Sequence, residues 1–145
     1  MLYETASAEL KQMLEDTFTV EFFNKDVTER IKTYEDACSE LGIDPVSESH
    51  MRSGGFTTDV IVYCKIRTIT KALNEGWKPN WKDENQKKWV PWFATLSPSG
   101  FAFLDSFFNC TSPIAGYASR PCFKSEELAK YAGEQFIELY KDFIL

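Results

Sequence analysis

The sequence contains no long run of apolar residues. A membrane-spanning helix needs about 20 of them in a row, and no stretch of the 145 residues approaches that length. The first residues, Met1 to Thr5, also lack the basic start and the apolar run of a secretion signal. We therefore expect a cytoplasmic protein that makes no contact with a membrane.

Histidine is almost absent, because His50 is the only one. A Ser–His–Asp site, a two-histidine phosphoesterase and most histidine metal sites need more histidines than that. The chain also lacks a glycine-rich phosphate loop, since Gly54-Gly55 has the composition of a flexible turn. Adjacent carboxylates occur, but helix capping or a solvated face explains each pair. We predict a protein that is not an enzyme, with no catalytic residue, metal ligand or cofactor; a lone base at His50 and an acid-only metal site stay open as alternatives.

None of the four cysteines forms a C-x-x-C pair, so the sequence supports neither a zinc knuckle nor a thioredoxin-like site. A reducing cytoplasm keeps such thiols free. We expect the four to be small, reduced, mostly buried hydrophobic residues. They are Cys38, Cys64, Cys110 and Cys122.

Positive charge is scarce in the first third of the chain and concentrated in the middle. Residues 1–48 hold 12 acidic and 4 basic residues, residues 52–124 hold 10 basic and 5 acidic ones, and the net charge is −6. This balance argues against a general nucleic-acid binder, which needs a basic footprint. The middle segment keeps enough positive charge to attract a small anion, although a solvated mixed surface is the simpler interpretation.

Apolar side chains are plentiful: 43% of the residues are hydrophobic and 15% are aromatic. That supply argues against disorder. A chain of this length is typical of one domain and can bury a core without disulfides. We predict a single domain over residues 1–145.

Three segments in the N-terminal half have the periodicity of helices. The first runs from about Ser7 to Phe18, and the second lies between a capping box that starts at Thr33 and a left-handed Gly42. The third runs from Thr58 to Gly76, where frequent β-branched residues make a strand the competing interpretation. Their apolar faces hold Leu10, Met13, Leu14 and Phe18, then Tyr34, Ala37, Cys38 and Leu41, then Val62, Ile66, Ile69 and Leu73.

The second half predicts loops and strands. Residues 43–57 are rich in breakers and 77–85 form an aromatic loop. Pro91 confines the first strand to an edge or a bulge, and Pro121 makes the third one irregular. The three strands run from Lys87 to Leu96, from Phe101 to Phe108 and from Tyr117 to Phe123. On the middle strand, Phe101, Phe103 and Phe107 share one face, while Leu104 and Phe108 share the other.

A closing helix follows Ser125, which can cap it. One continuous apolar stripe runs along this helix and should pack on the sheet. The predicted fold is therefore α+β, with N-terminal helices, a three-stranded antiparallel meander and a C-terminal helix packed on the sheet. The stripe consists of Leu128, Ala132, Phe136, Leu139 and Phe143.

Four stretches carry a family resemblance: Glu29 to Cys38, Lys71 to Trp81, Lys88 to Phe93 and Ser119 to Ala129. In this order, and over nearly the full chain, they resemble a family of uncharacterised small proteins from gut Bacteroidota and their phages and mobile elements. The most specific element is Gly-Trp-x-Pro-x-Trp, and the chain departs from the family pattern at Trp89-Val90 and Pro121. The resemblance implies a phage or mobile-element accessory protein, which would lie in the host cytoplasm if it is phage-encoded.

Four tryptophans lie within 16 residues, interleaved with lysines. Aromatic faces beside cations can hold a nucleobase or a phosphate, and they also form protein-binding hot spots. The remaining interpretation is that all four rings belong to the core. Because Trp89 and Trp92 are three residues apart in a strand, they should point to opposite faces. The candidate ligand-binding or partner-binding residues are Trp77, Trp81, Lys88, Trp89, Trp92 and Arg120.

Two functions follow from these features. The first is a non-catalytic protein that binds a host or phage protein through its acidic N-terminal helices or its aromatic face. The second is a small-ligand binder that sequesters a planar, nucleotide-type anion, such as a defence signal, in an aromatic and basic groove.

Overall fold

The computed structural model describes residues 7–17, 25–98, 100–109 and 121–145 of the chain. Within these ranges the fold is α+β, as the sequence predicts. No helix in them combines the length and apolar character needed to cross a membrane. The elements are α2 (Ala8–Thr17), α4 (Val27–Arg30), α5 (Tyr34–Leu41), α6 (Glu48–Ser53), α7 (Thr58–Leu73), β1 (Lys88–Ser97), β2 (Gly100–Asn109), α8 (Glu126–Gln135) and α9 (Ile137–Ile144).

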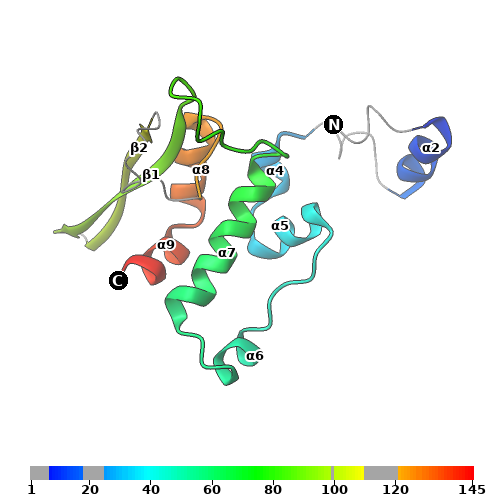
Figure 1. Ribbon diagram of the computed structural model, residues 1–145. Helices are drawn as coiled ribbons and strands as arrows, with labels where there is room; N and C mark the ends of the chain where they lie inside the picture. Colours follow the sequence, from blue (N-terminus) through cyan, green and yellow to red (C-terminus); the bar gives the residue numbers. More distant parts are fainter. Residues whose placement is uncertain (1–6, 18–24, 99, 110–120) are drawn as a thin grey trace.

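The long helix α7 lies in the middle of the molecule, with helices on both sides (Figure 1). α5 packs on one side of it and α9 on the other. α8 lies next to α9 and packs against the β1–β2 hairpin on the side away from α7. Helix α2 stands apart at the opposite end of the molecule from the hairpin (Figure 1). The arrangement is thus a row of layers, from the hairpin through α8 and α9 to α7 and α5.

The helices α5 and α7 form as their sequences predict. The Thr33 hydroxyl accepts a bond from the Asp36 backbone, the Asp36 carboxylate accepts one from the Thr33 backbone, and Gly42 ends α5 with φ of 63°. On α7 the predicted stripe is buried, so the competing strand interpretation is wrong. The buried stripe consists of Val62, Ile66, Ile69 and Leu73.

Two short helices lie where the sequence analysis placed none. α6 occupies part of the predicted loop over residues 43–57, because the Ser47 side chain accepts a bond from the His50 backbone and starts a helical turn. α4 follows Asp26, whose carboxylate accepts bonds from the backbone and hydroxyl of Thr28. The capping side chains, rather than apolar periodicity, produce both elements.

The first predicted helix is present as α2, with the Ser7 hydroxyl accepting a bond from the Leu10 backbone at 3.4 Å. Its apolar side is open to solvent, since Leu10 and Met13 are 42% and 60% exposed. Phe18, the last member of the predicted face, lies outside the described residues.

The single closing helix of the prediction is two helices. The chain leaves the helical conformation at Phe136, where φ is −111° and ψ is 28°, so α8 and α9 point in different directions. α8 packs on the hairpin as expected, whereas α9 packs mainly on α7 and reaches the hairpin through Tyr140, whose ring lies 4.9 Å from that of Phe93. The stripe is therefore divided between two partners, and Phe143 ends it 40% exposed with its ring stacked on Tyr63 of α7.

The predicted third strand is a single bridge among the described residues. Trp89 and Phe123 exchange both of their backbone hydrogen bonds, at 3.0 and 2.7 Å. Continuing this antiparallel register would place Pro91 opposite Pro121, and neither proline has an N–H to donate. The described sheet therefore has two strands rather than three, and residues 117–120 of the prediction lie outside the described residues.

A bulge in β2 changes which aromatic residues share a face. Trp92 pairs with Asp105 and the next residue, Phe93, pairs with Phe103, so Leu104 is an extra residue that shifts the alternation. Phe107 consequently points away from the helices, and its ring lies 5.8 Å from that of Trp92. The predicted grouping of Phe101, Phe103 and Phe107 is wrong, because a period of two does not continue through a bulge.

One contact sets how closely the hairpin lies on α8. Gly133 is buried, and a Cβ there would lie 2.5 Å from two ring atoms of Phe103 and 2.9 Å from the Cβ of Pro91. Real Cβ contacts are longer than this, so only glycine fits the present spacing. The hairpin therefore depends on the absence of a side chain at this position.

We predict that Gly133→Ala lowers the free energy of unfolding by about 1–3 kcal/mol, the usual cost of overpacking, in spite of alanine's better helix propensity. Chemical denaturation followed by far-UV circular dichroism measures this change. The control is Glu134→Ala, at the exposed neighbouring position, which should change stability by far less. Equal stability of Gly133→Ala and the native protein would show that the hairpin is not held at this spacing.

Candidate functional site

The predicted binding residues do not form one groove. Trp77 and Trp81 lie half-buried in the loop between α7 and β1, and Lys88 begins β1. Trp89 and Trp92 face opposite sides of the hairpin, as their spacing predicts: Trp89 packs against the core and Trp92 is exposed. The sixth residue, Arg120, lies outside the described residues.

Lys88 is a structural cation of the aromatic loop. It is 2% exposed, and its ammonium group donates to the carbonyl oxygens of Asp83 and Gln86 at 3.3 and 2.8 Å. The same nitrogen lies 5.4 Å from the centre of the Trp81 ring. A buried ammonium needs such partners to offset the loss of hydration. The positive charge of Lys88 is thus engaged in holding the loop rather than pointed at a ligand.

Trp89 belongs to the inner side of the hairpin. Its ring lies 4.9 Å from that of Phe108, and the ammonium group of Lys87 sits over both rings, 5.7 Å from the first and 4.5 Å from the second. Because Trp89 also packs against the main core, it anchors the sheet to the helices.

The outer side of the hairpin carries an exposed apolar cluster, here called the hairpin patch: Trp92, Leu104 and Phe107. They are 55%, 57% and 54% exposed, and the Trp92 and Phe107 rings contact each other. Sequence reasoning found Trp92 but missed the other two, because only the bulge at Leu104 turns Phe107 outward. In the sequence, Pro91 of β1 is the single residue that indicates a nearby bulge.

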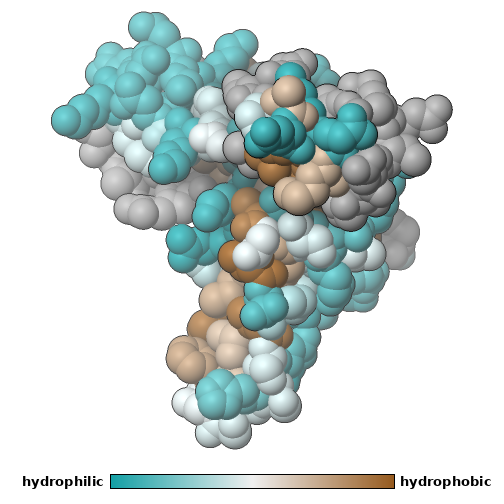
Figure 2. Space-filling model, turned by 90° about the vertical axis from the view of Figure 1, so that its right-hand side faces the viewer, coloured by the Kyte–Doolittle hydropathy of each residue, from teal (hydrophilic) through white to brown (hydrophobic). Residues whose placement is uncertain are grey.

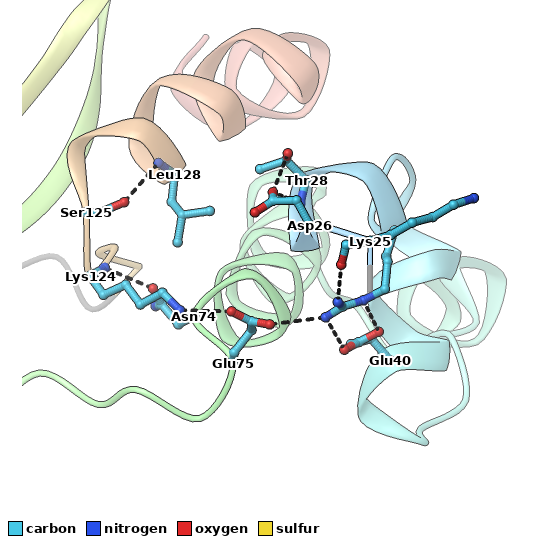
Figure 3. Close-up of polar contacts among 10 residues, drawn as sticks. Lys25, Asp26, Thr28, Glu40, Asn74, Glu75, Lys124, Ser125 and Leu128 are labelled. Atoms are coloured by element: carbon cyan, nitrogen blue, oxygen red, sulfur yellow. Dashed lines mark hydrogen bonds and ion pairs between the residues drawn. The ribbon is translucent and has the colours of Figure 1, made fainter. Parts of the chain in front are cut away.

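A second feature, absent from the sequence analysis, is a charge network at the C-terminal end of α7 (Figure 3). The guanidinium group of Arg30 donates to Glu40 at 2.9 Å and to Glu75 at 3.1 Å, and Lys124 donates to the other oxygen of Glu75 at 3.0 Å. Glu75 has a φ of 48°, a left-handed conformation that side chains other than glycine rarely adopt. The network joins α4, α5, α7 and the segment before α8.

Asn74, the residue before Glu75, links the end of α7 to the segment before α8. It is 4% exposed; its amide nitrogen donates to the Cys122 carbonyl at 2.8 Å, and its oxygen accepts from the Lys124 backbone at 3.0 Å (Figure 3). These two bonds from one side chain connect the end of α7 to residues 122–124. Because the bond to the Cys122 carbonyl is buried, that carbonyl would be left without a partner if the side chain were removed.

The ionisation of Glu75 reflects its surroundings. Burial raises its pKa, but hydrogen bonds and ion pairs from Lys124 and Arg30 lower it more, so the pKa lies below its ordinary value of 4.5. The carboxylate is therefore charged at neutral pH and stabilises the fold in that form. The charges of this network pair with one another and link three parts of the fold.

Three of the four cysteines lie among the described residues. Burial raises the pKa of the Cys122 thiol to about 11, so the thiol stays protonated at neutral pH. Cys38 is also buried and Cys64 half-buried, all three as free thiols, whereas Cys110 lies outside the described residues. No group of three or more His, Cys, Asp or Glu within the described ranges could hold a metal ion. An open depression of about 510 Å³ lies between Thr58 and the end of α9, at Phe143.

We predict that Asn74→Ala lowers the free energy of unfolding by about 1–3 kcal/mol, because one buried and one partly buried backbone group lose their partners. Thermal and urea unfolding measure the change. Asn80→Ala is a control from the exposed loop and should cost far less. A small effect of Asn74→Ala would mean that residues 122–124 keep their place without the asparagine.

We also predict that Glu75→Gln weakens the acid sensitivity of the fold. The pKa of Glu75 is lower in the folded protein than in the unfolded one, so its stabilisation is complete above about pH 4.5 and is lost as the pH falls through the folded value. Native protein and variant should therefore differ at pH 7 and converge at low pH. Urea unfolding from pH 7 to pH 3 tests this, with Glu84→Gln as an exposed control; a difference that is constant with pH would contradict it.

No protein-family model, curated protein or solved structure matches the chain. Its function is therefore inferred from the geometry of its own residues.

Proposed function

We propose that this is a non-catalytic interaction protein that binds a protein partner through the hairpin patch. The observation that carries the proposal is the exposed pair of touching rings, Trp92 and Phe107, with Leu104 beside them at the bulge. Tryptophan and other large rings dominate binding energy in protein interfaces when a partner buries them. Exposed clusters of this kind mark interaction sites more often than scattered single residues do.

The construction of the hairpin supports this proposal. Its inner side packs on α8 through Gly133, and Trp89 anchors it to the core. The patch is thus displayed on a backbone fixed from behind, so binding would not require the rings to be ordered first. A partner gains more from such a preorganised surface than from a mobile one.

The family resemblance indicates the biological role that we propose. A phage or mobile-element accessory protein that acts on a host or phage protein would need a binding surface and no reaction centre. The hairpin patch, the location in the host cytoplasm and the absence of catalytic chemistry are parts of the same proposal.

The alternative function, sequestration of a planar anion, has less support. It needs a cation free to meet the ligand between the aromatic rings, and Lys88 instead donates to two loop carbonyls. Trp77 and Trp81 are separated from Trp92 because the last points to the outer side of the hairpin. The protein-binding function is therefore preferred.

The test is capture of partners by tagged native protein and by the Trp92→Ala and Phe107→Ala variants. We expect a partner retained by the native protein to be lost, with affinity reduced at least tenfold, in either variant. The matched control is Phe56→Ala, an aromatic residue 51% exposed on another part of the surface. Retention of the same partners by both patch variants would refute the proposal, and a nucleotide that shifts the melting temperature of the native protein would favour the alternative.

A further inference from the structure

The two outer edges of the hairpin differ in what they offer to another strand. On β1, the N–H and C=O of Trp89 are both hydrogen-bonded to Phe123, and Pro91 has no N–H. On β2, no described residue pairs with the outer edge along its length. An open, apolar edge is a ready template for pairing with another chain.

The directions of the β2 backbone groups follow from the bridge. Because Trp89 points its N–H and C=O toward Phe123, the pair Trp89–Phe108 has no hydrogen bonds between its two members. The groups of Phe108 must then point away from β1, and so must those of Ser106, two residues back in the same register. Pro91 lies opposite Ser106, where its missing N–H is not needed.

These outward groups suit a second copy of the same strand. In an antiparallel pair centred on Phe107, Ser106 of one copy lies opposite Phe108 of the other, and both pairs can exchange backbone hydrogen bonds. The two-fold arrangement keeps inner side chains beside inner ones and outer beside outer ones, as a continuous sheet requires. β2 is suited to such pairing because Asp105 is its only charged residue.

Asp105 already accepts the Ser106 N–H, which pairing with a second copy would need. Its carboxylate accepts the N–H of Ser106 at 2.8 Å, and the ammonium group of Lys130 on α8, itself 2.7 Å from Glu126, lies 3.4 Å from that carboxylate. The bulge at Leu104 interrupts the edge immediately before it. A bulge and a charge are the devices by which natural sheets keep their edges from associating.

We propose that the outer edge of β2 is a self-pairing edge for a second copy of this chain, and that Asp105 keeps it closed by capping the Ser106 amide. The inference is independent of the partner-binding role of the hairpin patch, because it concerns the backbone edge rather than the outer face. It accounts for the single charge in an otherwise uncharged strand. The native protein is accordingly a monomer.

The experiment compares the masses of the native protein and of Asp105→Val over a hundredfold range of concentration, by sedimentation equilibrium. We expect the native mass of 16.7 kDa throughout and a rise toward twice that mass for Asp105→Val. Slower hydrogen exchange at the Phe108 amide should accompany the rise. Asp105→Thr, a second strand-favouring substitution, gives the same comparison if the valine variant does not fold.

Two further variants identify the cause. Lys130→Gln removes the ion pair but keeps the cap, and it should remain a monomer. Adding Ser106→Pro to Asp105→Val removes the outward N–H, as Pro91 does on β1, and should restore the monomer. Native protein that is already dimeric, valine and threonine variants that both stay monomeric while folded, or a dimer that survives Ser106→Pro would each overturn the proposal.

Discussion

The side chain of Asn74 joins the end of α7 to a segment that follows it by 48 to 50 residues. It bonds to Cys122 and Lys124 from the end of α7, which places the fully buried Phe123 where it can bridge to Trp89. Through that bridge the hairpin is connected to α7, and through Ser125 the same segment starts α8. The charges of Arg30, Glu75 and Lys124 connect α4, α5 and the segment before α8 to the end of α7, with a left-handed backbone at Glu75.

The hairpin is asymmetric because its two sides and two edges meet different surroundings. Its inner side needs a glycine on α8 and its outer side exposes rings. On one edge the described pairing stops at the bridge between Trp89 and Phe123, and on the other the Asp105 carboxylate accepts the Ser106 N–H. A second apolar band runs down another face of the molecule (Figure 2). Val60 of α7 and Phe56, just before α7, are also exposed. On the hairpin patch, by comparison, two large rings that contact each other are each more than half exposed, at Trp92 and Phe107.

Sequence reasoning succeeded where the determinants are local. The capping box at Thr33, the left-handed Gly42 and the stripe on α7 each depend on residues a few positions apart, and all three are present. It failed where the chain meets distant segments. The break at Phe136 separates α8, which packs on the hairpin, from α9, which packs on α7. The bulge at Leu104 brings Phe107 beside Trp92. Neither position is a glycine or proline that would indicate the irregularity in the sequence.

The sequence by itself determined the fold class, the helices α5 and α7 and the two strands of the hairpin, because periodicity and caps act over a few neighbouring residues; it did not determine the third strand or the division of the closing helix. It also identified the aromatic cluster, but not its division into a core anchor at Trp89, a loop staple at Trp81 and Lys88, and an exposed patch at Trp92. Only the tertiary structure decided that division. The side on which a ring lies depends on strand register, and register is set by the bridge to Phe123 and by the packing of Gly133, both of which involve segments far away along the chain.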